Sequence, residues 1–558
     1  MNFEIAILKM ESTDIDEDKR LRASSTGVLQ RDSAHSGTGG NVGSSSEVKV
    51  PNLEPPKPEA QFQTDHLLQD IGRRAISAGF VTIGAQGAKF LASFAAAATL
   101  SRLLSPKDFG LVGMVLGVTG LVAVFMELGL STATVQRKNI TQEQVSNLFW
   151  INVAFGTALA LICAAMSPLV ARFYRDPHVT NIMLALSASF LLTSSAVQHR
   201  ALLARQMRFR EIAVIDVTSI SVGVASACLL AWYGIGYWAL VAQQLVTALV
   251  ALVMTWTRSG WRPQRPSRNS QVTPLVKFGA HISAADFVSQ FALNSDSILI
   301  GRIFGAVQLG FYTRAYVLLA RPLQQVIMPV NSVLIPVLSR LQNDPPRYRR
   351  SYMRAYDTLA LFVFSFAGVC IVLARPMVLV ILGPRWSGVI PLFAAFTLVG
   401  IAGPLTSVVS WIYESQARGK DQLQNHTLAG IVTVLSYLAG LPWGPIGLIL
   451  AVAISNLLIR MPIVYHLAGR KGPVTTGDLW FGFWSHVPCW GTVFISTFLI
   501  HKTVENMAPI VQLLVCAPLG TGAGIALALI FPRPRKSIFF ALKTVRNALS
   551  GRFTPEEA

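Results

Sequence analysis

Polar side chains recur at helical spacing inside a stretch of the chain that is otherwise apolar. In residues 274–300, Asp286, Gln290, Asn294 and Ser297 follow one another at steps of four, four and three. This spacing places them on one face of a helix. A polar face on an apolar helix is expected to line the interior of a bundle or an aqueous cavity.

Positive charge is concentrated in the next apolar stretch, residues 312–338. It contains Arg314, Arg321 and Gln325 at near-heptad steps. A guanidinium group donates two parallel hydrogen bonds, which is the geometry that a phosphate requires. We therefore predict a cationic, hydrogen-bonding cavity for an anionic, polar substrate. The candidate substrate-binding residues are Lys89, Gln290, Asn294, Arg302, Arg314, Arg321 and Gln325. Arg302 and Arg314 lie near the ends of their stretches, where they could instead reach lipid headgroups.

Acidic residues within apolar stretches are candidates for coupling transport to a proton or sodium ion. They are Glu127, Asp216, Asp286 and Asp296. Each could equally be a structural partner for a nearby arginine or lysine. The chain has no GxxxxGK[ST] phosphate loop, no GxSxG and no HExxH motif. We therefore predict that it is not an enzyme and that it uses no metal and no cofactor.

The composition is that of an integral membrane protein. The 558 residues are 52% hydrophobic and only 13% charged, whereas a soluble domain usually carries about 25% charge. From Arg73 onward, apolar runs reach the length of about 20 residues that a membrane-spanning helix needs. The predicted spans are 76–101, 109–135, 146–171, 179–198, 212–232, 237–257, 274–300, 312–338, 356–382, 387–413, 423–441, 446–466, 479–500 and 509–531. The sequence thus predicts an all-α membrane protein of about 14 helices.

The net charge of +19 is distributed unevenly among the predicted loops. Basic residues gather in alternate loops, such as 200–210, 258–268 and 340–354. Loops rich in lysine and arginine stay on the cytoplasmic side of a membrane. This alternation predicts that both termini are cytoplasmic, and it accounts for the basic excess without a nucleic-acid partner.

The chain contains an internal repeat. Residues 101–111 align without gaps on residues 301–311, and both copies share an arginine and, eight positions later, a glycine between large apolar residues. Such a repeat indicates a duplicated bundle with a pathway between its halves. We predict a disordered cytoplasmic tail over 1–70, six-helix lobes over 71–260 and 278–470, a cytoplasmic linker over 261–277, and two additional helices with a basic cytoplasmic tail over 471–558.

Several segments, in their order and spacing, resemble the polysaccharide transporter branch of the multidrug/oligosaccharidyl-lipid/polysaccharide exporter superfamily, and within it the Wzx-type flippases of exopolysaccharide and colanic-acid-type pathways. These segments are LSRLLSPKDFGL (100–111), ELGLSTATVQRK (127–138), DSILIGR (296–302), LGFY (309–312), LIPVLSR (334–340) and LGPRW (382–386). The resemblance covers about residues 72–470.

The resemblance implies two pseudo-symmetric six-helix lobes around a central cavity that work by alternating access. It implies an undecaprenyl-diphosphate-linked oligosaccharide as substrate, moved across the bacterial inner membrane for exopolysaccharide or lipopolysaccharide synthesis. It also implies, as partners, the polysaccharide polymerase and co-polymerase of the same pathway.

Three other functions stay open on the sequence alone. A multidrug/cation antiporter of the same superfamily would need an acidic or apolar cavity. A membrane polymerase or glycosyltransferase would need a large periplasmic loop or a soluble domain with paired carboxylates. A passive scaffold of the assembly complex would use the basic loops as docking sites.

Overall fold

The computed structural model describes residues 71–123, 140–266 and 273–549, together with the single residues 126, 131, 134 and 135. This part of the chain is α-helical almost throughout and contains no strand. Eleven of its helices are long and apolar enough to cross a membrane. The all-α membrane fold is therefore confirmed. The predicted tail over 1–70 and the acid Glu127 lie outside the described residues.

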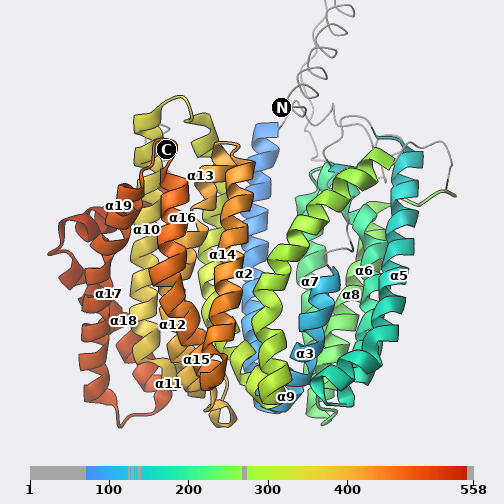
Figure 1. The fold of residues 1–558 in the computed structure, drawn as a ribbon, viewed down its shortest axis with the longest axis horizontal. Helices are drawn as coiled ribbons and strands as arrows, with labels where there is room; N and C mark the ends of the chain where they lie inside the picture. The colour runs from blue at the N-terminus through green and yellow to red at the C-terminus, as the bar shows by residue number, and fades with distance from the viewer. Residues whose placement is uncertain are drawn as a thin grey trace, which may run out of the picture. The chain divides into compact units, whose positions relative to one another are not determined.

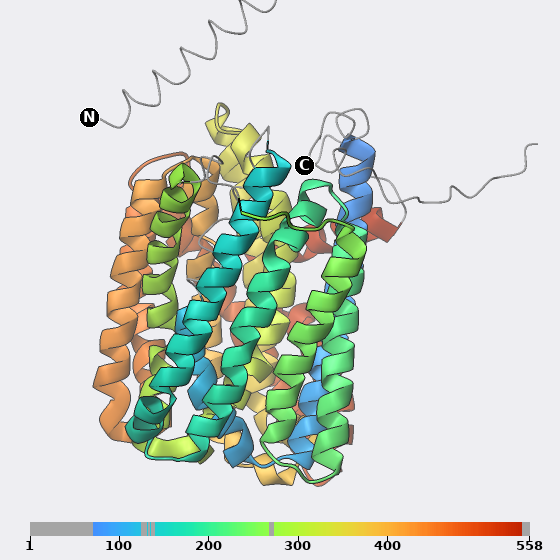
Figure 2. The same cartoon turned by 90° about the vertical axis from the view of Figure 1, so that its right-hand side faces the viewer.

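The six N-terminal helices are α2 (Ile71–Leu103), α3 (Pro106–Ala123), α5 (Gln142–Tyr174), α6 (His178–Arg205), α7 (Phe209–Trp232) and α8 (Trp238–Ser259). Five of the six follow the predicted spans closely, and α3 covers the first part of the predicted span 109–135, most of whose remainder lies outside the described residues. Helix α5 begins with a capping box, because the Thr141 hydroxyl and the Gln144 side chain satisfy each other's backbone N–H groups. The helices run side by side along a common direction (Figure 2).

Helix α9 (Thr273–Arg340) joins two predicted spans across a single kink. Gly305 at the kink has φ 81° and ψ −179°, a conformation that only glycine adopts readily. The predicted spans 274–300 and 312–338 leave residues 301–311 as the connection, in which the sequence favours a tight turn over Gly305–Gly310. The structure instead concentrates the change of direction at Gly305, and the helix resumes at Ala306.

The remaining helices complete the chain (Figure 1). They are α10 (Pro345–Val372), α11 (Ala374–Ile381), α12 (Val389–Ser407), α13 (Ser410–Ser415), α14 (Gly419–Gly440), α15 (Gly444–Ser455), α16 (Met461–Gly469), α17 (Thr476–Val504), α18 (Pro509–Ala528) and α19 (Pro532–Leu549). The sequence predicted only a basic tail where α19 lies. An Arg533–Asp357 ion pair at 3.0 Å fastens this helix to α10.

The helices of the structure do not give a direct count of the membrane spans. Of the eleven candidate stretches, 419–469 includes two of the predicted spans, and 294–340 includes one whole span and the end of another. The total of 14 and the division into two six-helix lobes therefore stay predictions.

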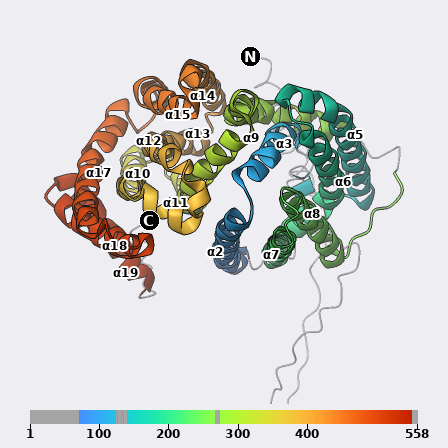
Figure 3. The same ribbon diagram turned by 90° about the horizontal axis from the view of Figure 1, so that it is seen from below.

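The two copies of the repeat pack against each other. Figure 3 shows α3 beside α9. A Cβ built on Gly110 would lie 1.7 Å from the carbonyl oxygen of Ala306, and one built on Gly310 would lie 2.0 Å from that of Pro106. In the alignment of the repeat, Gly110 matches Gly310 and Pro106 matches Ala306. The two contacts are thus reciprocal, as expected for halves related by a pseudo-two-fold axis.

Candidate functional site

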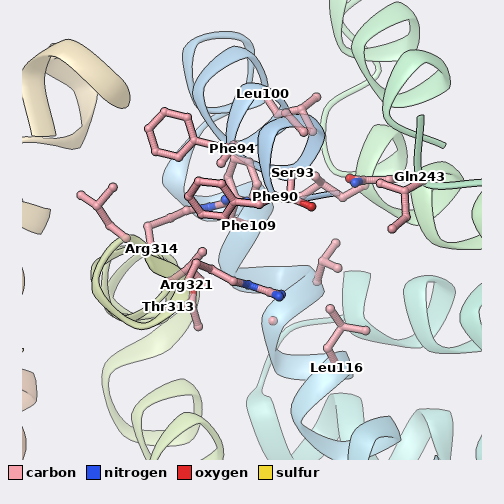
Figure 4. Close-up of a pocket in the computed structure, with 18 of the residues that line it drawn as sticks. Phe90, Ser93, Phe94, Leu100, Phe109, Leu116, Gln243, Thr313, Arg314 and Arg321 are labelled. Atoms are coloured by element: carbon pink, nitrogen blue, oxygen red, sulfur yellow. The ribbon is translucent and has the colours of Figure 1, made fainter. Parts of the chain in front are cut away.

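A cavity of about 520 Å³ lies between the N-terminal helices α2, α3 and α8 and the long helix α9 (Figure 4). This volume is typical of small-molecule sites. Its polar lining consists of Gln86, Lys89, Ser93, Gln243, Gln244, Asn294, Ser297, Thr313, Arg314, Arg321 and Gln325. No acidic residue among those the structure describes lines it.

Arg314 and Arg321 supply positive charge from α9. The guanidinium carbon of Arg314 lies 3.7 Å from the centre of the Phe109 ring on α3, a cation–π contact that holds the side chain at the cavity wall. Arg321 points into the cavity two turns further along α9 (Figure 4). Within the described part of the chain, neither arginine forms an ion pair with an acid. Both guanidinium groups can therefore bind an anion.

Lys89 lines the same cavity but has a partner. Its Nζ lies 2.5 Å from Oδ2 of Asp216 on α7. Arg200 on α6 donates to both oxygens of the same carboxylate, at 2.6 and 3.0 Å. The three side chains form a triad with one excess positive charge at the edge of the cavity.

The structure brings five of the seven predicted substrate-binding residues to this cavity: Lys89, Asn294, Arg314, Arg321 and Gln325. Arg302 lies outside the lining, with its guanidinium 5.5 Å from the centre of the Phe173 ring. Gln290 also lies outside it, and its backbone carbonyl accepts a hydrogen bond from Asn294 Nδ2 at 2.9 Å. Whether any of these residues binds substrate stays a prediction.

The predicted acids are dispersed. Asp216 belongs to the triad with Lys89 and Arg200. Asp296 is buried away from the cavity and accepts hydrogen bonds from the Tyr312 hydroxyl at 2.6 Å and the Ser297 backbone N–H at 2.5 Å. The side chains of Asp286 and Glu127 lie outside the described part. The described residues include no group of three or more His, Cys, Asp or Glu side chains that could hold a metal ion.

Sequence reasoning missed the wall that faces the arginines. Phe90, Phe94 and Phe109 form an aromatic surface, and Gln243 reaches the cavity from α8 (Figure 4). The adjacent pair Gln243 and Gln244 within an apolar stretch was the available signal. The phenylalanines gave no such signal in the sequence, because aromatic residues are common on any membrane helix.

Helices of membrane-spanning length and a cation-lined cavity among them define a multi-pass membrane protein of transporter architecture. The polysaccharide biosynthesis protein family matches residues 99–391, more than half of the chain, and the chain belongs to this family. The resemblance to polysaccharide exporters is thus confirmed.

Curated relatives extend this match. The lipopolysaccharide biosynthesis protein WzxC of Escherichia coli K12 is 21% identical over 70% of this chain and 80% of its own length. The succinoglycan biosynthesis transport protein ExoT of Rhizobium meliloti is 28% identical over 56% of this chain and 64% of its own.

Solved structures share the fold. The lipid II flippase MurJ, in an inward closed conformation, superposes with a TM-score of 0.63 at 15% identity, covering 84% of this chain and 99% of MurJ. An inward-facing multidrug resistance transporter of the MATE family superposes with a TM-score of 0.55 at 14% identity, covering 70% of this chain and 95% of the transporter. At these identities the likeness concerns the fold alone.

Proposed function

We propose that the protein is a transporter that moves an undecaprenyl-diphosphate-linked oligosaccharide across the bacterial inner membrane by alternating access, for exopolysaccharide or lipopolysaccharide synthesis. The observation that carries this proposal is the cavity between α2, α3, α8 and α9, in which Arg314 and Arg321 are the lining cations without an acidic partner among the described residues. A diphosphate is the fixed anionic part of such a substrate, whatever its sugars. Family membership and the names of WzxC and ExoT support the pathway.

The charge of the cavity is the main argument for an anionic substrate. Two guanidinium groups in a partly desolvated cavity attract phosphate more strongly than they would in water, because the effective dielectric constant is lower. Each can also donate a bidentate pair of hydrogen bonds. In this proposal Arg314 and Arg321 bind the diphosphate, and Asn294 and Gln325 add neutral hydrogen bonds.

A multidrug/cation antiporter is disfavoured by the same observation. A cationic drug in this cavity would meet Arg314 and Arg321 with no carboxylate among the described lining residues to offset them. A polymerase or glycosyltransferase would need paired carboxylates at a site of reaction. Asp216 and Asp296 do not pair with each other, because Asp216 binds Arg200 and Asp296 binds Tyr312.

Arg321→Ala tests the proposal. Loss of a charged hydrogen-bonding partner costs about 1.5–3 kcal/mol, or roughly 10- to 100-fold in binding. We expect the variant to reach the membrane at normal abundance but to export almost no surface polysaccharide. Arg340→Ala is the matched control, because Arg340 ends the same helix outside the cavity lining. Normal export by the Arg321 variant would remove this residue from the mechanism.

A further inference from the structure

A second cavity, of about 450 Å³, lies among the N-terminal helices and borders the cationic cavity. Lys89, Leu116, Ile220 and Gln244 line both cavities, so the two share a wall. The other lining residues of the second cavity come from α3, α6, α7 and α8. A substrate bound in the cationic cavity can therefore extend into the space among the N-terminal helices.

Residues with a hydroxyl group line this second cavity on four helices. They are Thr119, Ser189, Thr193, Ser219 and Thr247. Thr119, Ser189 and Ser219 donate to backbone carbonyls of their own helices, at 2.9, 2.6 and 3.2 Å. Their oxygen lone pairs remain able to accept hydrogen bonds from a ligand. The cavity thus offers many neutral acceptors, which suit a ligand that carries many donors.

The charged residues at its edge argue against a small ion. Asp216 is already held by Lys89 and Arg200, so a metal cation or a proton would have to compete with both. A small inorganic anion needs donors, but the hydroxyl donors of three lining residues are used within their helices. A neutral polyol does not compete for Asp216 and does not depend on donors from the protein, because each of its hydroxyls can both donate and accept a hydrogen bond. Leu116, Leu186 and Ile220 provide apolar contacts for its C–H groups.

We propose that this second cavity is the binding subsite for a sugar unit of the lipid-linked oligosaccharide. The inference rests on the proposed function, because the sugar is joined directly to the diphosphate and its subsite must adjoin the cationic cavity. Lys89 stands where the two cavities meet, between the diphosphate and the sugar. Thr193 and Thr247 belong to α6 and α8, two helices that contribute no acidic or basic residue to this lining. In this proposal they bind the sugar through neutral hydrogen bonds.

Two probes separate the subsite from the diphosphate site. The first is undecaprenyl diphosphate without sugar, and the second is the lipid-linked repeat unit extracted from cells that lack this gene. Binding of each is measured to the purified full chain in lipid nanodiscs. For Thr193→Val combined with Thr247→Val, we expect binding of the repeat unit to weaken about tenfold, as for two lost neutral hydrogen bonds. Binding of undecaprenyl diphosphate should not change.

Thr433→Val is the matched control. Thr433 is a partly buried helical threonine that donates to Ala429 O at 2.8 Å, and it lines neither cavity. Equal weakening for both probes, or no weakening for the repeat unit, would overturn the sugar subsite while leaving the proposed function intact. If the unaltered protein bound neither probe, the proposed function and the subsite would both fall.

Discussion

Arg314 and Phe109 come from different halves of the chain, and their contact shows how the cavity keeps a charge at its wall. A planar guanidinium stacked on a ring loses little freedom when it then binds a phosphate, because it is already ordered. A lysine ammonium at this position would be a flexible point charge. At residue 314 the geometry of the cationic group therefore matters as well as its positive charge.

We expect Arg314→Lys to weaken binding of undecaprenyl diphosphate about tenfold although the positive charge is kept. The loss comes from the bidentate hydrogen bonds and the flat contact with Phe109, neither of which an ammonium reproduces in full. Isothermal titration of the purified protein measures the change. Arg340→Lys serves as the control. Full affinity in the Arg314 variant would show that charge alone is sufficient at this position.

Helical periodicity predicted which residues of α9 face the cavity but not which residues of other helices meet them. Asn294 and Ser297 could be assigned to one polar face, and Arg314, Arg321 and Gln325 to the next apolar stretch, because the spacing within a helix fixes direction. Gln290 was assigned to the same face as Asn294 but lies outside the lining. The Lys89–Asp216 pair joins residues 127 positions apart, and no spacing rule connects two helices. For the same reason Asp216 looked as suitable for ion coupling as Asp296 did.

At the scale of the elements, the contact between α3 and α9 depends on two glycines. Gly110 and Gly310 let each helix approach the backbone of the other copy of the repeat, so closely that no side chain would fit. Two further bonds join the same region: Trp386 Nε1 donates to Ser101 O at 2.6 Å, and Arg102 Nη2 donates to Val380 O at 2.7 Å. The two halves of the chain are thereby closed against each other at the end where α2 stops and α3 begins.

We expect Gly110→Ala to destabilise the protein by about 1–3 kcal/mol, because the added methyl group must push α3 away from Ala306. Gly113→Ala, one turn further along α3, should be tolerated, since a Cβ there would lie 3.5 Å from Leu309 Cδ2, an ordinary contact. Thermal unfolding of the two purified variants provides the comparison. Equal melting temperatures would mean that the close approach of α3 and α9 has no energetic role.

The length of apolar runs predicted most helices because a membrane span imposes a minimum of about 20 residues. The length of apolar runs could not predict helix α19. Its sequence is basic and too polar to span, and the bonds that hold it come from tertiary partners such as Asp357. The position of the kink in α9 did not follow from the sequence, because Gly301, Gly305 and Gly310 each permit a change of direction and only Gly305 adopts a positive φ.

At the scale of the whole described region, the cavity lies between α2, α3, α8 and α9, the two helices α3 and α9 being in close contact at Gly110 and Gly310. An alternating-access transporter must part such a contact to release its substrate on the other side of the membrane. The basic loops predict which side is cytoplasmic, and this orientation stays a prediction. With this orientation, we predict that the substrate enters from the cytoplasmic leaflet and leaves to the periplasmic one.

The most direct test of that claim is made in cells from which the gene is deleted. Surface polysaccharide is quantified, and lipid-linked repeat units are labelled with a reagent that reaches only the periplasmic leaflet. We expect export to stop and intact units to accumulate unlabelled on the cytoplasmic side, with both effects reversed by the unaltered gene but not by Arg321→Ala. Units that reach the periplasmic leaflet and remain unpolymerised would contradict it, because the protein would then act after translocation.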